Sequence, residues 1–225
     1  MTLSLLARCP DTGQFGMVIA SSSPAVAARG AHARAGVGVA ASQNITDPAL
    51  GPALLDRLAS GQTAAQAMQA VVAAAEPHSA RRQLMVIDAA GGTAFHCGAG
   101  MLGLWSVADA PGAIAGGNLL ANRDVPQAMI AAYTAAPGAF GDRLLAALRA
   151  GRDAGGEAGS LHSAGLLIVD RLSWPAADLR CDWTGLCPVD VLCTVWDVYQ
   201  PQMQAYIQRA STPDLAPGFG VPGDP

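Results

Sequence analysis

Lysine is missing from this sequence, and charge of either sign is sparse. All 13 cationic residues are arginine, and charged residues make up 13% of the 225 positions. A catalytic cation must therefore be an arginine, a histidine or the amino terminus. The net charge is −4 and no basic cluster occurs, so we expect nucleic acid to be excluded as a partner.

The segments that direct proteins into or through membranes are also missing. No run of about 18 apolar residues is free of glycine and charge, so we expect no membrane-spanning helix and no membrane partner. The sequence does not begin with a positively charged segment that leads into an apolar one. We therefore expect no signal peptide and a cytoplasmic location.

Cysteines are few, and their spacing does not suit a metal. Their number is odd and no C-x-x-C pair occurs. They stand at Cys9, Cys97, Cys181, Cys187 and Cys193. The pattern fits neither a disulfide framework nor a common zinc site. We expect reduced, mostly buried thiols, no metal and no other cofactor.

Aromatic residues amount to only 5%, whereas hydrophobic residues reach 51% because alanine is abundant. A chain of this length and composition can bury one full core and still present an apolar subunit interface. We expect a single domain over residues 1–210, an extended tail over residues 211–225, and assembly into a homo-oligomer.

The first segment with a clear structural signal is TLSLLARCPDTGQFGMVIASSS, residues 2–23. Two apolar runs flank Pro10, Asp11, Thr12 and Gly13, which are turn-forming residues. The pattern predicts a β-hairpin whose two strands are buried on both faces. Residues 2–8 should be a central strand of a sheet.

A buried first strand that begins with Thr2 has two interpretations. One is a hairpin whose first residue has no chemical role. The other is an N-terminal nucleophile (Ntn) hydrolase, in which the side chain of residue one attacks and its own α-amine takes the proton. A free α-amine has a pKa of about 8, which suits a general base at neutral pH.

The remaining pattern alternates groups of strands with pairs of helices. The predicted strands lie at residues 36–42, 83–88, 93–97, 104–107, 113–115, 163–169 and 176–182. Asp47 and Thr63 should cap two helices that end near Gly61 and residue 75. Further helices are predicted at residues 124–135, 141–152, 188–199 and 201–210. The stretch SPAVAARGAHARAG, residues 23–36, should form turns and short extended pieces.

This order indicates an α+β fold with two mostly antiparallel sheets packed between helix layers, a four-layer αββα sandwich. Strict β-α-β alternation is absent, which argues against a Rossmann plan. The stretch from Gly98 to Gly103 matches G-x-G-x-x-G, but a strand-like segment follows it where a helix would be needed to receive a pyrophosphate.

Several polar residues stand at strand ends, where substrates often bind. Ser42, Gln43 and Asn44 end the third predicted strand, so their backbone N–H groups could hold an anion, or they could serve the following turn. Asn118 follows two glycines and could orient a substrate or hold its turn. The other candidates are His162 at a strand start, and Arg180, which shares a strand face with Asp182.

Blocks along nearly the whole chain resemble the bacterial Ntn-hydrolase-like family called domain of unknown function 1028. They include ARAGVGVAASQNITDPALGP, RRQLMVID, AIAGGNLLANRDVPQAM, HSAGLLIVD, WPAADLRCDW and FGVPGD. The QNITDP and AGGN blocks are the most specific. The resemblance implies an αββα fold and indicates no particular substrate.

Compared with proteasome-like Ntn hydrolases, the resemblance implies that Thr2 is the nucleophile once Met1 has been removed. It also implies an oxyanion region at Ser42 to Asn44, with Asn44 as a catalytic residue. Two features depart from that pattern. Ser21, Ser22 and Ser23 stand where an acidic residue is usual, and no lysine is available. Arg34 is the favoured replacement for the lysine, and Ser21 is a candidate for binding substrate.

Two functions follow from these observations. The first is hydrolysis of an amide C–N bond in a small-molecule or peptide-like substrate, with Thr2, Arg34 and Asn44 in the catalytic centre. Residues proposed to bind the substrate are Ser21, Ser42, Gln43, Asn118, His162 and Arg180. The second is a non-catalytic Ntn-like protein that binds a small metabolite or serves in an assembly. Loss or retention of Met1 distinguishes them, because only a free Thr2 amine can act as the base.

Overall fold

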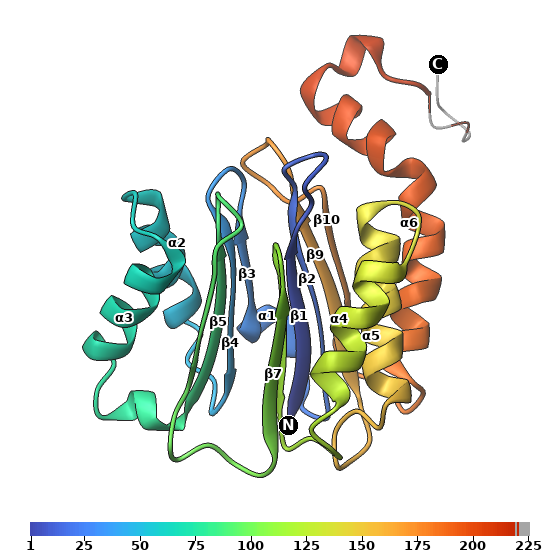
Figure 1. Cartoon of the computed structure of the whole chain (residues 1–225). Coiled ribbons are helices and arrows are strands. Elements are labelled where there is room, and N and C mark those ends of the chain that lie inside the picture. The colour runs from blue at the N-terminus through green and yellow to red at the C-terminus, as the bar shows by residue number, and fades with distance from the viewer. Residues whose placement is uncertain (219, 221–225) are drawn as a thin grey trace.

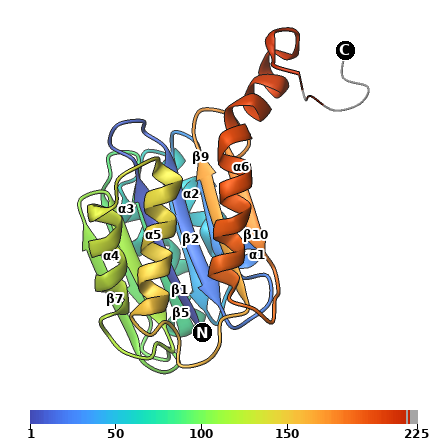
Figure 2. The same ribbon diagram turned by 90° about the vertical axis from the view of Figure 1, so that its right-hand side faces the viewer.

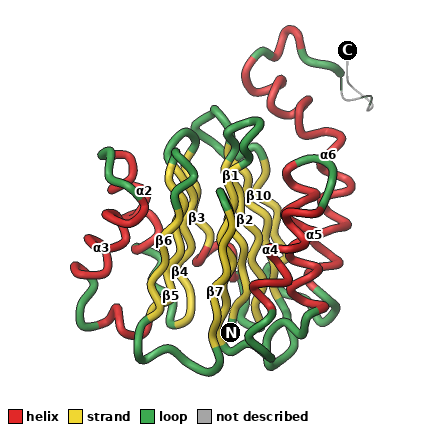
Figure 3. The backbone as a smooth tube through the Cα atoms, in the orientation of Figure 1, coloured by secondary structure: helices red, strands yellow, loops and turns green. Residues whose placement is uncertain are grey.

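The computed structural model describes residues 1–218 and residue 220. In this part the chain forms two antiparallel sheets and six α-helices (Figures 1 and 3). The strands are β1 (Thr2–Arg8), β2 (Phe15–Ser21), β3 (Ala31–Arg34), β4 (Gly38–Asn44), β5 (Arg82–Asp88), β6 (Thr93–Cys97), β7 (Trp105–Ala110), β8 (Ala113–Asn118), β9 (Ser163–Val169) and β10 (Ala177–Cys181). The helices are α1 (Val26–Gly30), α2 (Leu50–Ala59), α3 (Ala64–Ala74), α4 (Val125–Ala135), α5 (Phe140–Asp153) and α6 (Pro188–Ser211).

Strand β1 lies inside the larger sheet, whose strand order is β10-β9-β2-β1-β8-β7. It pairs antiparallel with β2 on one side and with β8 on the other, and its residues from Thr2 to Ala7 are buried. The turn after Cys9 joins β1 to β2 as a hairpin. The prediction of a central N-terminal strand covered on both faces is confirmed.

The two sheets face one another through an apolar core. Leu6 and Met17 of the larger sheet meet Val39 and Met85 of the smaller sheet, whose order is β3-β4-β5-β6. Side chains alternate along a strand, so Leu5 points the other way, into a core shared with α4, α5 and α6. Helices α2 and α3 cover the outer face of the smaller sheet (Figure 1).

Two local predictions need correction. Residues 23–36 contain helix α1, where no helix was expected. The four-residue strand β3 agrees with the short extended pieces predicted there. Helix α2 begins at Leu50 rather than next to Asp47, because the Asp47 carboxylate accepts from the N–H of Ala49 and shapes a turn before the helix. Thr63 does cap α3, in a reciprocal pair with Gln66.

Helix α6 runs through Pro201 without ending, whereas two separate helices were predicted. Proline removes one backbone donor, but this part of the helix is exposed, so water can satisfy the freed carbonyl. The second half of α6 projects beyond the sheets (Figure 2). Ser211 still belongs to α6 and residues 213–215 form a short 3₁₀ turn, so this part of the predicted tail is not extended. Residues 219 and 221–225 lie outside the described part.

None of the helices within residues 1–218 is both long enough and apolar enough to cross a membrane. The five cysteines are free thiols, and Cys9, Cys181 and Cys193 are buried.

The core between the sheets should carry much of the stability. Leu6→Ala removes a fully buried side chain there, so it should cost about 2–5 kcal/mol of the free energy of unfolding. The matched control is Leu215→Ala, an identical change at an exposed position, which should stay within about 0.5 kcal/mol. Denaturant titrations of the three proteins measure both. Equal losses from the two changes would contradict this view of the core.

Candidate functional site

Thr2 lies at the end of the central strand, and its exposed fraction is only 4%. Its hydroxyl Oγ1 donates to the carbonyl oxygen of Met1. The hydroxyl of Ser21, from the neighbouring strand β2, donates to the same carbonyl. The Met1 carbonyl therefore lies between the hydroxyl groups of Thr2 and Ser21.

The serines after β2 form a small hydrogen-bonded cluster beside Met1. Ser21 Oγ lies 2.8 Å from Ser23 Oγ and accepts from the backbone N–H of Ser23 at 3.1 Å. The hydroxyl of Ser163, at the start of β9, donates to the carbonyl of Ser23 at 2.6 Å. The bend after β2 is thus fixed on both sides, and it brings Ser21 next to Met1.

A buried carboxylate, Glu157, lies beside this bend and was not predicted. Its two oxygens accept from the backbone N–H of Ser22 at 3.2 and 3.1 Å, and its exposed fraction is 4%. Residue 157 also bridges to Leu120, just beyond β8. Glu157 therefore places a carboxyl group next to the end of β2, where the chain itself carries three serines.

The environment of Glu157 opposes its ionisation. Burial raises the pKa of the carboxyl to about 7, while the positive amino terminus, the Ser22 N–H and His162 act in the opposite direction. A carboxyl that titrates near neutral pH beside an amino terminus is typical of a functional site. Only its position among glycines in GRDAGGEAGS distinguished Glu157 in the sequence, which is a weak signal.

A surface pocket of about 360 Å³ opens beside Glu157. Its walls come from the end of α5, the loop that follows, and the start of α6. Glu157, His162, Arg152 and Cys187 are its titratable lining residues. A side-chain carbon on Gly159, another lining residue, would lie 3.3 Å from the terminal carbon of Met1, so the first residue packs against this loop.

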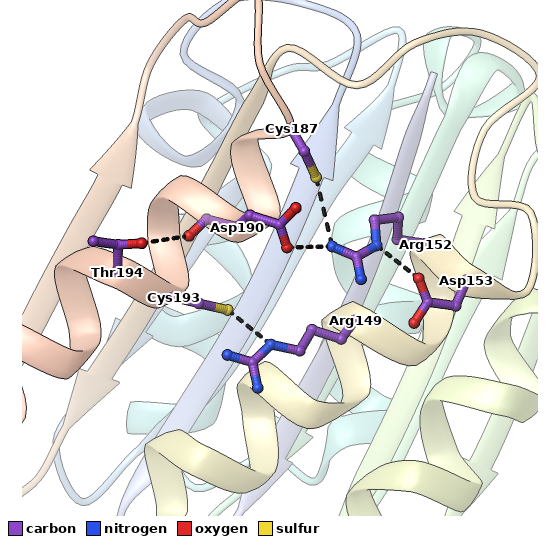
Figure 4. A network of polar contacts seen from close by, with 7 residues as sticks. All are labelled: Arg149, Arg152, Asp153, Cys187, Asp190, Cys193 and Thr194. Atoms are coloured by element: carbon purple, nitrogen blue, oxygen red, sulfur yellow. Dashed lines mark hydrogen bonds and ion pairs between the residues drawn. The ribbon is translucent and has the colours of Figure 1, made fainter.

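Arg152 is already occupied by partners on the rim of the pocket. Figure 4 shows its guanidinium between Asp153 and Asp190, with Cys187 also in contact. The arginine holds the pKa of the Asp190 carboxyl below its ordinary value. Nearby, Arg149 Nε lies 3.1 Å from Cys193 Sγ (Figure 4). These contacts join α5 to α6 and leave the pocket with little net positive charge.

His162 lines the pocket in a fixed orientation. Its Nδ1 lies 2.9 Å from the carbonyl of Thr184, which can only accept, so Nδ1 carries a proton. The ring stacks on Trp183 with a centroid distance of 4.5 Å. The structure thus brings His162 near Glu157, as its effect on the carboxyl pKa requires.

The residues predicted at the end of the third strand, Ser42, Gln43 and Asn44, point to two different sides of the smaller sheet. Gln43 points between the sheets, where its Oε1 accepts from Ser4 Oγ at 3.0 Å. Ser42 points the other way and donates to the carbonyl of Asp47 at 2.7 Å, which is turn chemistry. Asn44 has a φ of 73° and donates to the carbonyl of Arg81. Of the three side chains, only that of Gln43 faces β1.

Arg34 and Arg180 lie apart from Thr2. Arg34 pairs with Gly38 at the opposite end of β4 from Gln43, on the order of 17 Å away at about 3.4 Å per residue, and its guanidinium contacts Asp56 at 2.8 Å. Arg180 lies on the edge strand β10 and pairs with Asp182 at 3.6 Å, both half exposed. The predicted Arg180–Asp182 pair is present, but neither arginine is brought to the amino terminus.

Backbone strain is concentrated at the same end of the sheets. Among the described residues, Ala25, Asn44 and Leu119 are the non-glycine positions with positive φ. Leu119 follows Asn118, the cross-strand partner of Thr2, and Asn44 ends β4 beside Gln43. Such strain costs about 1–3 kcal/mol per residue and clusters at functional sites. Within the described residues no group of histidine, cysteine and carboxylate side chains is placed to hold a metal ion.

Comparison with known proteins gives a family but no activity. The family described as "Family of unknown function (DUF1028)" matches residues 2–192, which confirms the resemblance to DUF1028 and does not test an Ntn-hydrolase activity. The crystal structure of protein SPO2555 from Silicibacter pomeroyi, assigned to the same family, is 29% identical with a TM-score of 0.83 over 88% of this chain and 89% of that one. A mutant of Anbu from Hyphomicrobium sp. strain MC1 is 12% identical, with a TM-score of 0.44 over 91% and 97% of the two chains. No curated protein matches.

Glu157 should make stability depend on pH. Its pKa rises from an ordinary 4.5 to about 7 on folding, so the folded state binds the extra proton and its advantage is lost as pH rises between these values. Glu157→Gln stays neutral, so it should lose less stability than the wild type from pH 5 to pH 8. The difference should amount to several degrees in Tm, since one pKa unit is about 1.4 kcal/mol and each kcal/mol is about 2–4 °C.

The control is the same change at the exposed Glu76, the other glutamate of the chain. Thermal melts across this pH range should show no such divergence for Glu76→Gln. If Glu157→Gln follows the wild-type curve at every pH, the carboxyl is not perturbed as described.

Proposed function

This chain belongs to the DUF1028 family of unknown function. From its own residues, we propose that it is an Ntn hydrolase. It cleaves an amide C–N bond of a small-molecule or peptide-like substrate, with Thr2 as the nucleophile after Met1 is removed. The order of helices, sheet, sheet and helices supports assignment to the αββα arrangement of that class. The observation that carries the proposal is the placement of Thr2 at the buried end of β1, between Ser21 and Asn118.

The carbonyl of Met1 indicates where a substrate carbonyl binds. It lies against Thr2 Oγ1, which is where an acyl group must lie for attack, and Ser21 Oγ donates to its oxygen. We assign Ser21 as the donor that stabilises the oxyanion of the tetrahedral intermediate. The backbone N–H groups near Gln43 were expected to hold the oxyanion, but Gln43 pairs with Gln83 of β5 in the smaller sheet. We therefore assign this role to Ser21.

The reaction then proceeds in two stages. Thr2 Oγ1 attacks the carbonyl carbon as its proton moves to the α-amine, and that proton passes to the leaving nitrogen when the C–N bond breaks. Water hydrolyses the resulting ester on Thr2. Glu157, close to the amino terminus, takes the place of the acidic residue that the serines after β2 do not provide.

A binding protein without catalysis is the second candidate. Two sequence features favour it: the chain has no lysine, and Ser21, Ser22 and Ser23 stand where an acidic residue is usual. The intact mass of the purified protein separates the two. Loss of Met1 agrees with the hydrolase, and a chain that keeps Met1 in its native host contradicts it.

The residue test uses Thr2→Ala, Thr2→Ser and the wild type on a panel of N-acyl amino acids, amino-acid amides and short peptides, with release of product followed by mass spectrometry. Thr2→Ala should fold and lose at least about 10³-fold in turnover, because the nucleophile is gone. Thr2→Ser should keep part of it. Thr12→Ala, the same change in the exposed turn after β1, is the control and should act as wild type. Wild-type turnover by Thr2→Ala would exclude the mechanism.

A further inference from the structure

Four polar side chains form a hydrogen-bonded chain between the two sheets. Ser4 Oγ donates to Gln43 Oε1 at 3.0 Å, and Gln43 Nε2 donates to Gln83 Oε1 at 2.8 Å. Asn118 Nδ2 donates to the same Gln83 oxygen at 3.0 Å. All four residues are at most 1% exposed. Polar groups this deep between apolar sheets must find partners, so each unmet one needs a reason.

The backbone fixes the direction of this chain. Gln83 Nε2 donates to the carbonyl of Gly117 at 3.1 Å, and a carbonyl can only accept, so Gln83 Oε1 must face Gln43 and Asn118. Asn118 therefore presents its nitrogen to Gln83. Turning its amide over would place two oxygens against each other. Its oxygen Oδ1 is directed elsewhere by this arrangement.

Asn118 Oδ1 is fully buried and has no hydrogen-bond partner. A buried oxygen left without a donor costs about 1–3 kcal/mol. The other three members of the chain have partners for their side-chain polar atoms. Within this chain of side chains, Asn118 Oδ1, on the strand next to β1, is therefore the atom that has no donor.

Thr2 is the cross-strand partner of Asn118. Ser4 and Leu6 of β1 point between the sheets, so by alternation Thr2 does too, on the same side as Asn118. Directly opposed residues of an antiparallel pair have Cβ atoms about 4.5–5.5 Å apart. The unpaired oxygen of Asn118 thus lies in the space that faces the first residue of the mature chain.

Removal of Met1 changes the hydrogen bonding of Thr2 in the complementary sense. The peptide nitrogen of Thr2 becomes an amine with up to three donors, and the Met1 carbonyl that now accepts from Thr2 Oγ1 is lost. Thr2 then has donors without acceptors. Across the β1–β8 pair, Asn118 Oδ1 has no donor.

We propose that Asn118 Oδ1 accepts a hydrogen bond from the α-amine of Thr2 in the processed chain, which makes Asn118 a catalytic residue that holds the base. The inference rests on the proposed removal of Met1. An amine held at one N–H keeps its lone pair directed to Thr2 Oγ1. A neutral amide does this without an ion pair, which would lock the amine in its charged form. The other titratable groups at this end are Glu157, His162 and Cys97, which contacts Gln83.

The absence of lysine makes the amine directly measurable, because the amino terminus is the single aliphatic amine of the chain. The full chain is released at Thr2 from a cleavable amino-terminal fusion, so the free amine exists whether or not cells remove Met1. Acetylation by an N-hydroxysuccinimide ester is followed against pH by mass spectrometry of the first peptide. Asn118→Asp should raise the pKa of the amine and slow labelling at pH 7 by about 10-fold or more.

Asn118→Ala removes the acceptor that stabilises the charged amine, so it should speed labelling at pH 7 severalfold. This variant tests the inference if Asn118→Asp fails to fold. Asn122→Asp, a new charge at a partly exposed site, should label as wild type. In a chain released with Met1 in place, the amine lies one residue further out, so the Asn118 variants should change labelling far less. Folded Asn118→Asp and Asn118→Ala proteins that label like the wild type would overturn the inference.

The outcome separates this inference from the hydrolase proposal. Unchanged labelling with a Thr2-dependent activity removes Asn118 and leaves the hydrolase. Altered labelling with wild-type turnover by Thr2→Ala removes the hydrolase and leaves the contact between Asn118 and the amine.

Discussion

Burial of β1 on both faces is the constraint on which the rest of the molecule depends. The strand meets the helices through Leu5 and the other sheet through Leu6, so it cannot shift by one residue without exchanging its two apolar sets. This fixed register places Thr2 at the end of the sheet. A terminus that would otherwise fray is thereby held beside Ser21 of β2 and Asn118 of β8.

In the proposed processed chain, two polar side chains lie near the buried amino terminus at Thr2. Glu157 offers a negative charge whose ionisation is itself opposed by burial, and Asn118 offers a neutral oxygen. Neither fixes the amine as a permanent ion pair. Arg152, which lies nearby, pairs instead with Asp153 and Asp190 between α5 and α6 (Figure 4). In the proposed mechanism the α-amine of Thr2 is the base, so no lysine is needed near the nucleophile.

Apolar runs and turn residues predicted most strands and helices. The unbroken hydrophobic sequences of β1 and β2, for example, indicate that both strands are buried. The candidate site was harder to predict from the sequence. Glu157 reaches the terminus from a loop far along the chain, which no local spacing reveals. Ser42 was expected near Thr2, but alternation along β4 turns it outward. Arg34 was misplaced because residues 31–34 are a strand that carries it to the far end of the sheet.

The central claim is that Thr2 is a nucleophile with a free amine, and a reactive acyl donor tests it most directly. The purified chain is incubated with a β-lactone and digested, and the acylated residue is located by mass spectrometry. We predict an ester on Thr2 that hydroxylamine removes and that Thr2→Ala does not form. Acylation confined to other residues, in a chain shown to begin at Thr2, would contradict the account.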